Sequence, residues 1–276
     1  MRELTIGKND AGQRLDRFLS KALPLLPPAL AQKYIRIKRV KVNGGRAQRD
    51  QRLSAGDVLQ LYINDEFFDK PSEENLFLTL FKPHLTVVYE DEHLLLADKP
   101  QGMVVHADET EKVNTLINHI QAYLYQKREW NPKWENAFTP ALCNRIDRNT
   151  GGIVIAAKDA ETLRVINEKI RDRELDKRYL CITAGRPKKS EGRVECFLLK
   201  DEQKKQVSVY HKPIPGGKTA ITDYRVLETR GELSLVEIGL ETGRTHQIRA
   251  TMADLGCPLL GDGKYGRGDV NRRYGE

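Results

Sequence analysis

Five strand-patterned segments follow one another after residue 178, and polar turns separate most of them. Antiparallel strands can be joined by short turns, whereas parallel strands need a crossover of a dozen or more residues. The stretches at 187–192 and 213–217 are typical of hairpin ends. We therefore predict a mixed, largely antiparallel sheet rather than a doubly wound one. The five segments are 179–183, 194–199, 206–210, 220–227 and 233–240.

Upstream of this region, strand and helix patterns alternate. Apolar residues at 87–89 and 94–97 predict a hairpin, and those at 153–157 predict another strand. Helical spacing predicts helices over 113–124 and 163–170. Strands outnumber helices, so the predicted fold class is α+β.

The first 63 residues have the pattern of a separate, small α+β module. Apolar residues recur at helical spacing over 15–23, and a second helical stretch covers 29–37. Strand patterns follow at 40–42 and 58–63, after which the acidic, Phe-rich segment 64–80 is predicted to be a linker. A chain of 276 residues fits one small and one large domain, the large one spanning 81–276.

Positive charge is concentrated in the N-terminal module. Residues 1–63 contain 13 Lys and Arg against 5 Asp and Glu, while the rest of the chain contains 33 against 34. A merely solvated surface would spread the excess along the chain. A basic module on a near-neutral body is typical of a nucleic-acid binder.

The module resembles the S4 RNA-binding domain in its run Arg14-Leu15-Asp16-Arg17-Phe18-Leu19, in its turn at 39–44 and in Gly56-Asp57-Val58. The resemblance implies that the second helix and the following turn face RNA. Such cations position a phosphate backbone rather than read bases. The implied RNA contacts come from Lys33, Arg36, Lys38, Arg39 and Lys41.

No apolar run reaches about 18 residues, and no apolar leader begins the chain, so we expect a soluble, cytoplasmic protein without a membrane partner. The four cysteines are far apart, without a C-x-x-C pair or a nearby His. We expect free thiols, no metal and no cofactor. Cys143, four residues before Asp147, is expected to be a packed small side chain.

One acid lies between two arginines, just before a glycine turn and an apolar strand, in the run Asn144-Arg145-Ile146-Asp147-Arg148-Asn149-Thr150-Gly151-Gly152. Nearby cations favour the ionised form of a carboxylate. Alone, the pattern also fits an ordinary exposed ion pair. Three more segments place polar or aromatic groups at the ends of apolar strands, where a site on a rigid scaffold is often built: 98–106, 177–179 and 241–249.

In this order and spacing, the four segments resemble the catalytic domain of the RluA-type pseudouridine synthases over about residues 87–266. With the S4-like module in front, the chain is similar to the RluC/RluD branch, which modifies large-subunit ribosomal RNA. The resemblance implies a catalytic aspartate at Asp147, a base-contacting tyrosine at Tyr179 and an arginine paired with the aspartate at Arg249. It also implies RNA contacts from Arg145, Arg148, Lys177, Arg244 and His246.

The chain departs from the family pattern in three places. Asn144 stands where His is usual, and Gly151 stands where Ser is usual. Both flank Asp147, so they bear on the RNA contacts of this loop more than on the chemistry. The chain ends at Glu276, where family members usually continue through another strand-forming segment, so a shortened chain or a missing supporting strand is expected.

Isomerising uridine requires breaking the bond from C1′ to N1, turning the base and rejoining it through C5, without redox change. One carboxylate suffices, either by attacking C1′ or by removing a sugar proton, and both routes stay open. Arg249 would orient Asp147, and Tyr179 would stack on the detached uracil with its hydroxyl near the C5 proton. The uridine must be flipped out, and Arg145 or Arg148 would fill the gap, grip phosphates or simply be solvated.

Two features invite other interpretations. The segment 261–266 matches G-x-G-x-x-G, yet a dinucleotide site is not expected, because no amphipathic helix and no acid about 20 positions on follow it. A glycine-rich loop near the RNA, containing Tyr265, is predicted instead. His106 and His246 could be general bases, but hydrogen bonding in turns is favoured because neither has an acid at a recognisable spacing.

Three alternatives remain. A transfer-RNA pseudouridine synthase would share the chemistry, although the S4-like module favours ribosomal RNA. A non-catalytic RNA-binding or ribosome-assembly factor would not require Asp147, Tyr179 and Arg249 together. A metal-dependent nuclease would need clustered carboxylates, which are absent around Asp147. The sequence thus predicts a monomeric isomerase that acts on RNA, with large-subunit ribosomal RNA as its favoured partner.

Overall fold

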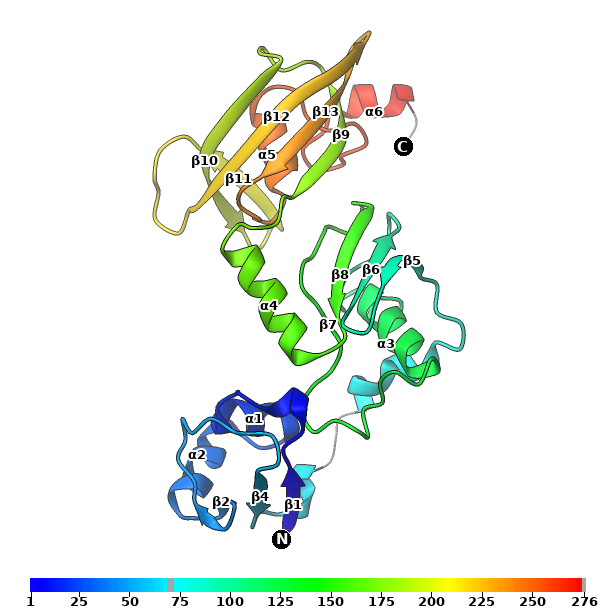
Figure 1. The fold of residues 1–276 in the computed structure, drawn as a ribbon. Helices are drawn as coiled ribbons and strands as arrows, with labels where there is room; N and C mark the ends of the chain where they lie inside the picture. The colour runs from blue at the N-terminus through cyan, green and yellow to red at the C-terminus, as the bar shows by residue number, and fades with distance from the viewer. Residues whose placement is uncertain (69–71, 275–276) are drawn as a thin grey trace. The chain divides into compact units, whose positions relative to one another are not determined.

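A computed structural model describes residues 1–68 and 72–274 (Figure 1). The chain forms two compact units, Met1–Glu168 and Lys169–Glu276, and each is described by itself. All pairings between the named strands of the described residues are antiparallel. The α+β class with largely antiparallel sheets is therefore confirmed.

The helices and strands predicted from periodicity are present, with ends shifted by up to three residues. The strands are β1 (Arg2–Thr5), β2 (Val40–Val42), β3 (Gly45–Arg46), β4 (Val58–Leu61), β5 (Thr86–Glu90), β6 (Leu94–Lys99), β7 (Ala141–Leu142), β8 (Gly152–Ala157), β9 (Arg178–Ala184), β10 (Glu191–Asp201), β11 (Gln206–Tyr210), β12 (Lys218–Arg230) and β13 (Leu233–Leu240). The helices are α1 (Leu15–Ala22), α2 (Pro28–Arg36), α3 (Leu116–Gln126), α4 (Ala160–Arg171), α5 (Gln247–Asp254) and α6 (Gly268–Tyr274), with short 3-10 helices at Lys8–Asp10, Asp65–Phe68 and Ser72–Thr79.

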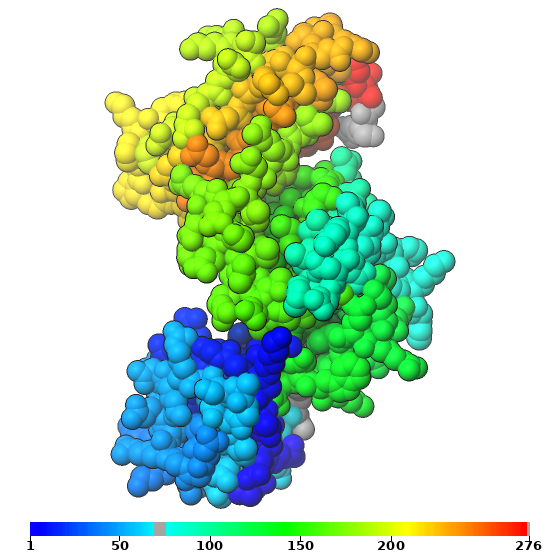
Figure 2. All heavy atoms as spheres, viewed as in Figure 1, coloured from blue at the N-terminus to red at the C-terminus, as the bar shows by residue number. Residues whose placement is uncertain are grey.

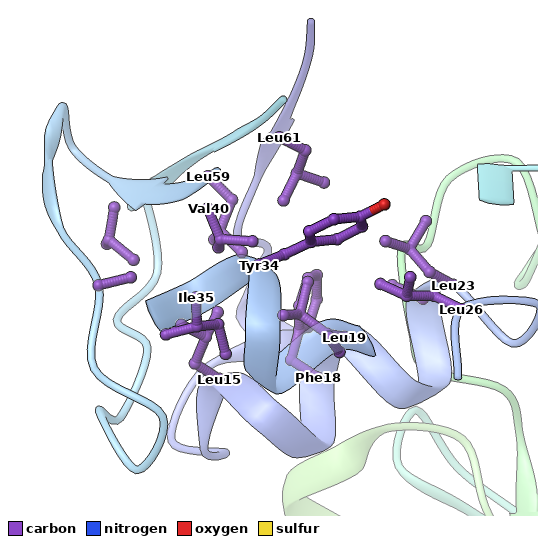
Figure 3. Close-up of a cluster of buried hydrophobic side chains, with 14 of the residues drawn as sticks. Leu15, Phe18, Leu19, Leu23, Leu26, Tyr34, Ile35, Val40, Leu59 and Leu61 are labelled. Atoms are coloured by element: carbon purple, nitrogen blue, oxygen red, sulfur yellow. The ribbon is translucent and has the colours of Figure 1, made fainter. Parts of the chain in front are cut away.

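In the N-terminal module, α1 and α2 pack on a sheet of order β1-β4-β2-β3. Leu15, Phe18 and Leu19 are fully buried on one face of α1, as helical spacing predicts (Figure 3). The expectation that the sheet follows both helices is wrong, because β1 precedes them and pairs with β4. That strand has four residues, of which only Leu4 is partly buried, so it carries no alternating pattern to detect.

The next sheet of the first unit has the order β5-β6-β8-β7, and α3 packs against it. Thr115 caps α3, because its hydroxyl accepts the N–H of Asn118 at 3.3 Å. Phe77, at the end of the predicted linker, is buried in the same core, while residues 69–71 of that linker lie outside the described part. The 64–80 boundaries remain a prediction.

The second unit is built on a sheet of order β11-β10-β12-β13-β9, with α5 packed on it (Figure 1). The hairpins are β10–β11 and β12–β13. The expected hairpin ends at 187–192 and 213–217 are wrong, because β9 does not pair with β10 and β11 does not pair with β12. Of the helices described, none is long and apolar enough to span a membrane.

A charge network surrounds Glu90 at the end of β5. Its carboxylate accepts hydrogen bonds from Lys127 and Lys158, each at 2.9 Å, and from the hydroxyl of Tyr123 at 2.8 Å. Burial alone would raise the pKa of Glu90, but these three donors together lower it to about 2. The network joins β5 to α3 and to the end of β8.

We expect Glu90→Gln to remove a pH-dependent part of the stability. The folded pKa lies below the usual 4.5, so ionised Glu90 stabilises the fold above about pH 4.5, and this contribution disappears as the pH falls towards 2. The expected difference in unfolding free energy at pH 7 is roughly 2 kcal/mol. Urea unfolding of both proteins from pH 7 to pH 3 measures it. Glu161→Gln, which changes an exposed acid, is the control and should have the unfolding free energy of the wild type at every pH. A difference between Glu90→Gln and the wild type that stays constant with pH would contradict the prediction.

Candidate active site

Asp147 lies half-buried in the loop between β7 and β8. Its carbonyl accepts the N–H of Thr150 at 3.0 Å, which closes a turn. The loop begins at Asn144, whose side-chain oxygen accepts the N–H of Ile155 at 2.8 Å and whose amide group donates to the carbonyl of Ile153 at 3.4 Å. Asn144 thus fastens the start of the loop to β8, a structural role for a residue that departs from the family pattern.

The second departure, Gly151, is compatible with a side chain. A Cβ at this position would lie 3.4 Å from the carbonyl oxygen of Lys99, an ordinary contact, and φ is not in the left-handed region. Gly152 beside it has φ +127°, which only glycine adopts readily. A lack of space for a Cβ therefore does not explain the glycine at position 151.

Lys99, at the end of β6, is fully buried and anchors the Asp147 loop. Its Nζ donates to the carbonyls of Pro100 at 2.9 Å, Met103 at 2.7 Å and Arg148 at 3.0 Å. Burial lowers the pKa of Lys99, and the negative charge of Asp147 opposes this. The sequence marks segment 98–106 as part of a site but does not show that Lys99 is the cation under the loop.

We expect Lys99→Met to destabilise the first unit and to lower activity. The substitution keeps the length of the side chain but removes the three hydrogen bonds of Nζ, at a cost of about 2 kcal/mol. Thermal unfolding and uridine conversion of the variant check this, with the exposed Lys82→Met as the matched control. An unchanged melting temperature and an unchanged rate would show that the three hydrogen bonds do not support the loop.

The two arginines beside Asp147 have different surroundings. Arg148 donates from Nη2 to Asp108 at 3.0 Å and to the hydroxyl of Thr110 at 2.6 Å. Arg145 is exposed, and loss of solvent together with the charge of Arg145 lowers the pKa of the nearby His106. Arg148 is also exposed and holds the 108–110 loop, and the RNA contacts implied for both arginines remain a prediction.

In the second unit, Tyr179 lies on β9, opposite Ile238 of β13, and packs half-buried against the core beside α5. The segment before α5 is fastened by Gln247, which is 2% exposed. Its side-chain oxygen accepts from Thr242 and from the N–H of Arg244, and its amide group donates to the carbonyl of Ile221 and the hydroxyl of Thr222. This arrangement explains the glutamine within segment 241–249.

Arg249, on the first turn of α5, forms a bidentate pair with Asp262. Nε donates to Oδ2 at 2.7 Å and Nη2 to Oδ1 at 2.8 Å. Sequence reasoning missed Asp262, because nothing local relates it to Arg249. Asp147 belongs to the first unit and Arg249 to the second, so the implied pairing of these two residues remains a prediction.

Two predicted RNA-contacting cations come together in the second unit. Burial lowers the pKa of Lys177, and the neighbouring positive charges of Arg173 and Arg244 lower it further. Arg244 is exposed and donates from Nε to the carbonyl of Thr219 at 3.0 Å. Arg173 and Lys177 lie between α4 and β9, Arg244 lies in the loop before α5, and Arg173 is also paired with Glu241 at 3.3 Å. Lys177 and Arg244 would favour binding of a phosphate.

The segment 261–266 is not a dinucleotide loop, although one premise of that prediction is wrong. A short helix, α6, does follow it. The backbone N–H groups of Lys264 and Tyr265 are already bound by Oδ1 of Asp262, at 2.8 and 3.1 Å, so the loop holds its own carboxylate where a phosphate would lie.

His246, which adopts a left-handed φ of 52°, contacts the hydroxyl of Tyr265 through Nδ1 at 3.0 Å. This agrees with the predicted turn role.

The predicted S4-type cations come from α2 and from the turn after it, in the part of the chain drawn in blue in Figure 2. Lys33, Arg36, Lys38 and Arg39 are exposed, whereas Lys41 is half-buried. Arg39 lies over the ring of Tyr34 at 5.5 Å, and Lys41 lies over that of Tyr62 at 5.3 Å.

The four cysteines are free thiols, as predicted. Burial raises the pKa of Cys143 and of Cys257 to about 11 and that of Cys181 to about 12, and it also raises the pKa of Cys196. Reactivity of a thiol depends on its thiolate. Cys143 is therefore a packed side chain near the Asp147 loop and not a nucleophile.

The chain is similar to known families and proteins along most of its length. Residues 93–254 match the family described as RNA pseudouridylate synthase, and residues 13–59 match the S4 domain. A ribosomal large subunit pseudouridine synthase C of Rickettsia prowazekii is 31% identical, with 93% of this chain and 83% of the relative covered. A ribosomal large subunit pseudouridine synthase D of Borreliella burgdorferi is also 31% identical, with 97% and 79% covered.

A solved human structure, RNA Pseudouridylate Synthase Domain Containing 4, is 25% identical, covers 72% of this chain and 74% of its own, and has a TM-score of 0.55. The synthase match contains Asp147, Tyr179 and Arg249, and it spans more than half of the chain. The S4 match contains all five predicted cations of the module. The chain therefore belongs to the RNA pseudouridylate synthase family and carries an S4 domain ahead of its synthase domain.

Proposed function

We propose that this protein converts specific uridines of large-subunit ribosomal RNA to pseudouridine, with Asp147 as the catalytic carboxylate and without metal or cofactor. The placement of Asp147 carries the proposal, since its loop is fixed by the buried Lys99 and by Asn144. The names of the Rickettsia and Borreliella relatives support ribosomal RNA as the substrate class.

The chemistry requires few groups. The bond between C1′ and N1 breaks, the uracil turns, C5 bonds to C1′, C5 loses a proton and N1 gains one, so the reaction is redox-neutral. Asp147 would either form a bond to C1′ or remove a sugar proton. Tyr179 would stack on the detached base and lie near the C5 proton. Arg249 would hold Asp147 ionised and oriented.

RNA binding would use both units. The cations of α2 and its following turn would hold a phosphate backbone, as would Lys177 and Arg244. Arg145 would serve at the flipped uridine, because it is exposed beside Asp147. We infer that the protein acts in the cytoplasm as a monomer.

The deciding experiment maps pseudouridines in ribosomal and transfer RNA from cells that lack the protein. We expect at least one pseudouridine of large-subunit RNA to disappear and to return with the wild-type gene but not with Asp147→Asn. Loss confined to transfer RNA would select the transfer-RNA alternative. An unchanged map in both RNA classes would favour a non-catalytic assembly factor.

A further inference from the structure

Asp262 is a buried carboxylate with four hydrogen-bond donors around it. Its side chain is 4% exposed and accepts two bonds from the guanidinium of Arg249 and two from the backbone of Lys264 and Tyr265. Burial by itself would raise the pKa of Asp262, but Arg249 and the two N–H groups lower it on balance. Asp262 is therefore ionised at neutral pH and fully engaged in this one arrangement.

Tyr265, three residues on, contacts the same guanidinium from another direction. Its ring centroid lies 5.2 Å from Cζ of Arg249, within cation–π distance. Its hydroxyl accepts the N–H of Val207 at 2.7 Å and lies 3.0 Å from Nδ1 of His246, and the two rings meet edge to face at 5.7 Å. One side chain thus joins Arg249, His246 and β11.

The backbone of the 261–266 loop is built to hold these two side chains. A Cβ at Gly266 would lie 2.2 Å from the carbonyl oxygen of Asp262, so only glycine fits there. Gly261 has φ +75°, and its N–H donates to the side chain of Asn271 on α6 at 2.9 Å. Asn271 in turn donates to the carbonyl of Asp262 at 3.3 Å. The glycine pattern and α6 serve the same purpose, which is to fix Asp262.

A buried ion pair such as Arg249–Asp262 contributes little net free energy to the stability of the fold. The cost of removing two charges from water largely offsets their attraction, and apolar replacements often stabilise a fold equally well. A bidentate contact does, however, fix the plane of a guanidinium. The contact with Asp262 uses one edge of Arg249, and the proposed contact with Asp147 would need the other. The arrangement therefore serves orientation.

We propose that Asp262 and Tyr265 are positioning residues of the synthase site. Asp262 sets the plane of Arg249, and Tyr265 supports that guanidinium while its hydroxyl donates to Nδ1 of His246, which leaves the imidazole proton on Nε2. The inference rests on the proposed function, because it assigns Arg249 and His246 to that site.

Single-turnover conversion of an RNA transcript carrying the mapped uridine tests Asp262. We expect Asp262→Asn to lower the saturating rate about 10- to 100-fold, because a misplaced group loses that much, while the Kd for RNA changes less than about threefold. The double variant Asp262→Asn with Arg249→Lys should have nearly the same saturating rate as Arg249→Lys alone, since a lysine cannot form the bidentate pair. An unchanged rate for Asp262→Asn, or an equal further loss in the double variant, would overturn the proposal.

The matched control is Asp269→Asn, which removes an exposed acid on α6 whose pair with Arg267 touches neither Arg249 nor His246. It should convert RNA at the wild-type rate. For Tyr265, nitrogen-15 NMR of His246 should show the Nε2–H tautomer in the wild type and a mixture in Tyr265→Phe, and equal spectra would refute the hydroxyl contact. This measurement needs no activity, so a wild-type protein that converts no uridine would sink the proposed function without obscuring the result.

Discussion

Replacement of Asp147 by asparagine is expected to abolish uridine conversion while leaving the fold and the affinity for RNA intact. An amide has nearly the same shape as a carboxylate, but it neither attacks C1′ nor removes a proton at neutral pH. The turn around Asp147 uses its backbone carbonyl, which the substitution preserves. The anchors Lys99 and Asn144 also remain. We expect a fall in single-turnover rate of at least about 10³-fold, the loss typical of an essential nucleophile or base.

Nucleoside mass spectrometry of a large-subunit RNA transcript measures this rate. The melting temperature and the Kd for the same transcript must be measured alongside, because a misfolded variant would also be inactive. Asp172→Asn, which removes an exposed acid paired with Arg171, is the matched control and should retain the full rate. Conversion by Asp147→Asn at more than about a tenth of the wild-type rate would show that Asp147 is not the catalytic group, and Tyr179 would then be the next candidate.

Local structure was predictable because it depends on neighbours in sequence. Helical spacing from Leu15 to Ala22 places four apolar side chains on one face, and that face is buried. The Asn43-Gly44 pair predicts a tight hairpin turn, and both residues have positive φ, at 51° and 75°. Strand pairing depends instead on distant partners, which is why β1 and the order β11-β10-β12-β13-β9 could not be predicted.

The same division applies to the candidate site. The roles of Asp147, Tyr179 and Arg249 were predicted because their neighbours form motifs. Lys99 and Asp262 were not given roles, because a buried charge is explained only by its partners. Arg148, the partner that links Lys99 to the Asp147 loop, lies 49 residues away, and Arg249, the partner of Asp262, lies 13 residues away. In both cases the useful signal is a charged residue inside an otherwise apolar or glycine-rich segment.

Neutralising the basic face of the S4 domain is expected to cause the second-largest loss, this time in binding. Changing Lys33, Arg36, Lys38 and Arg39 to glutamine should weaken RNA binding about 100-fold near physiological salt, because each cation releases condensed counterions. The slope of log Kd against log salt should fall by roughly 3. All four side chains are exposed, so the domain core should be unaffected. An unchanged salt slope would exclude this face as the phosphate contact.

Lys38 offers a way to separate binding from folding. It occupies the left-handed position that ends α2, with φ 64°; its N–H donates to the carbonyl of Ile35 at 3.2 Å, and that of Arg39 donates to the carbonyl of Tyr34 at 2.9 Å. Glycine is strongly preferred at this position of the motif, as Gly256 illustrates at the end of α5 with φ +80°. Lys38→Gly should therefore raise the unfolding free energy by about 0.5–1 kcal/mol while lowering the salt slope by about 1. A protein that becomes more stable and binds RNA less tightly would show that the lysine is kept for its charge, whereas unchanged binding would leave its unfavourable φ without a functional reason.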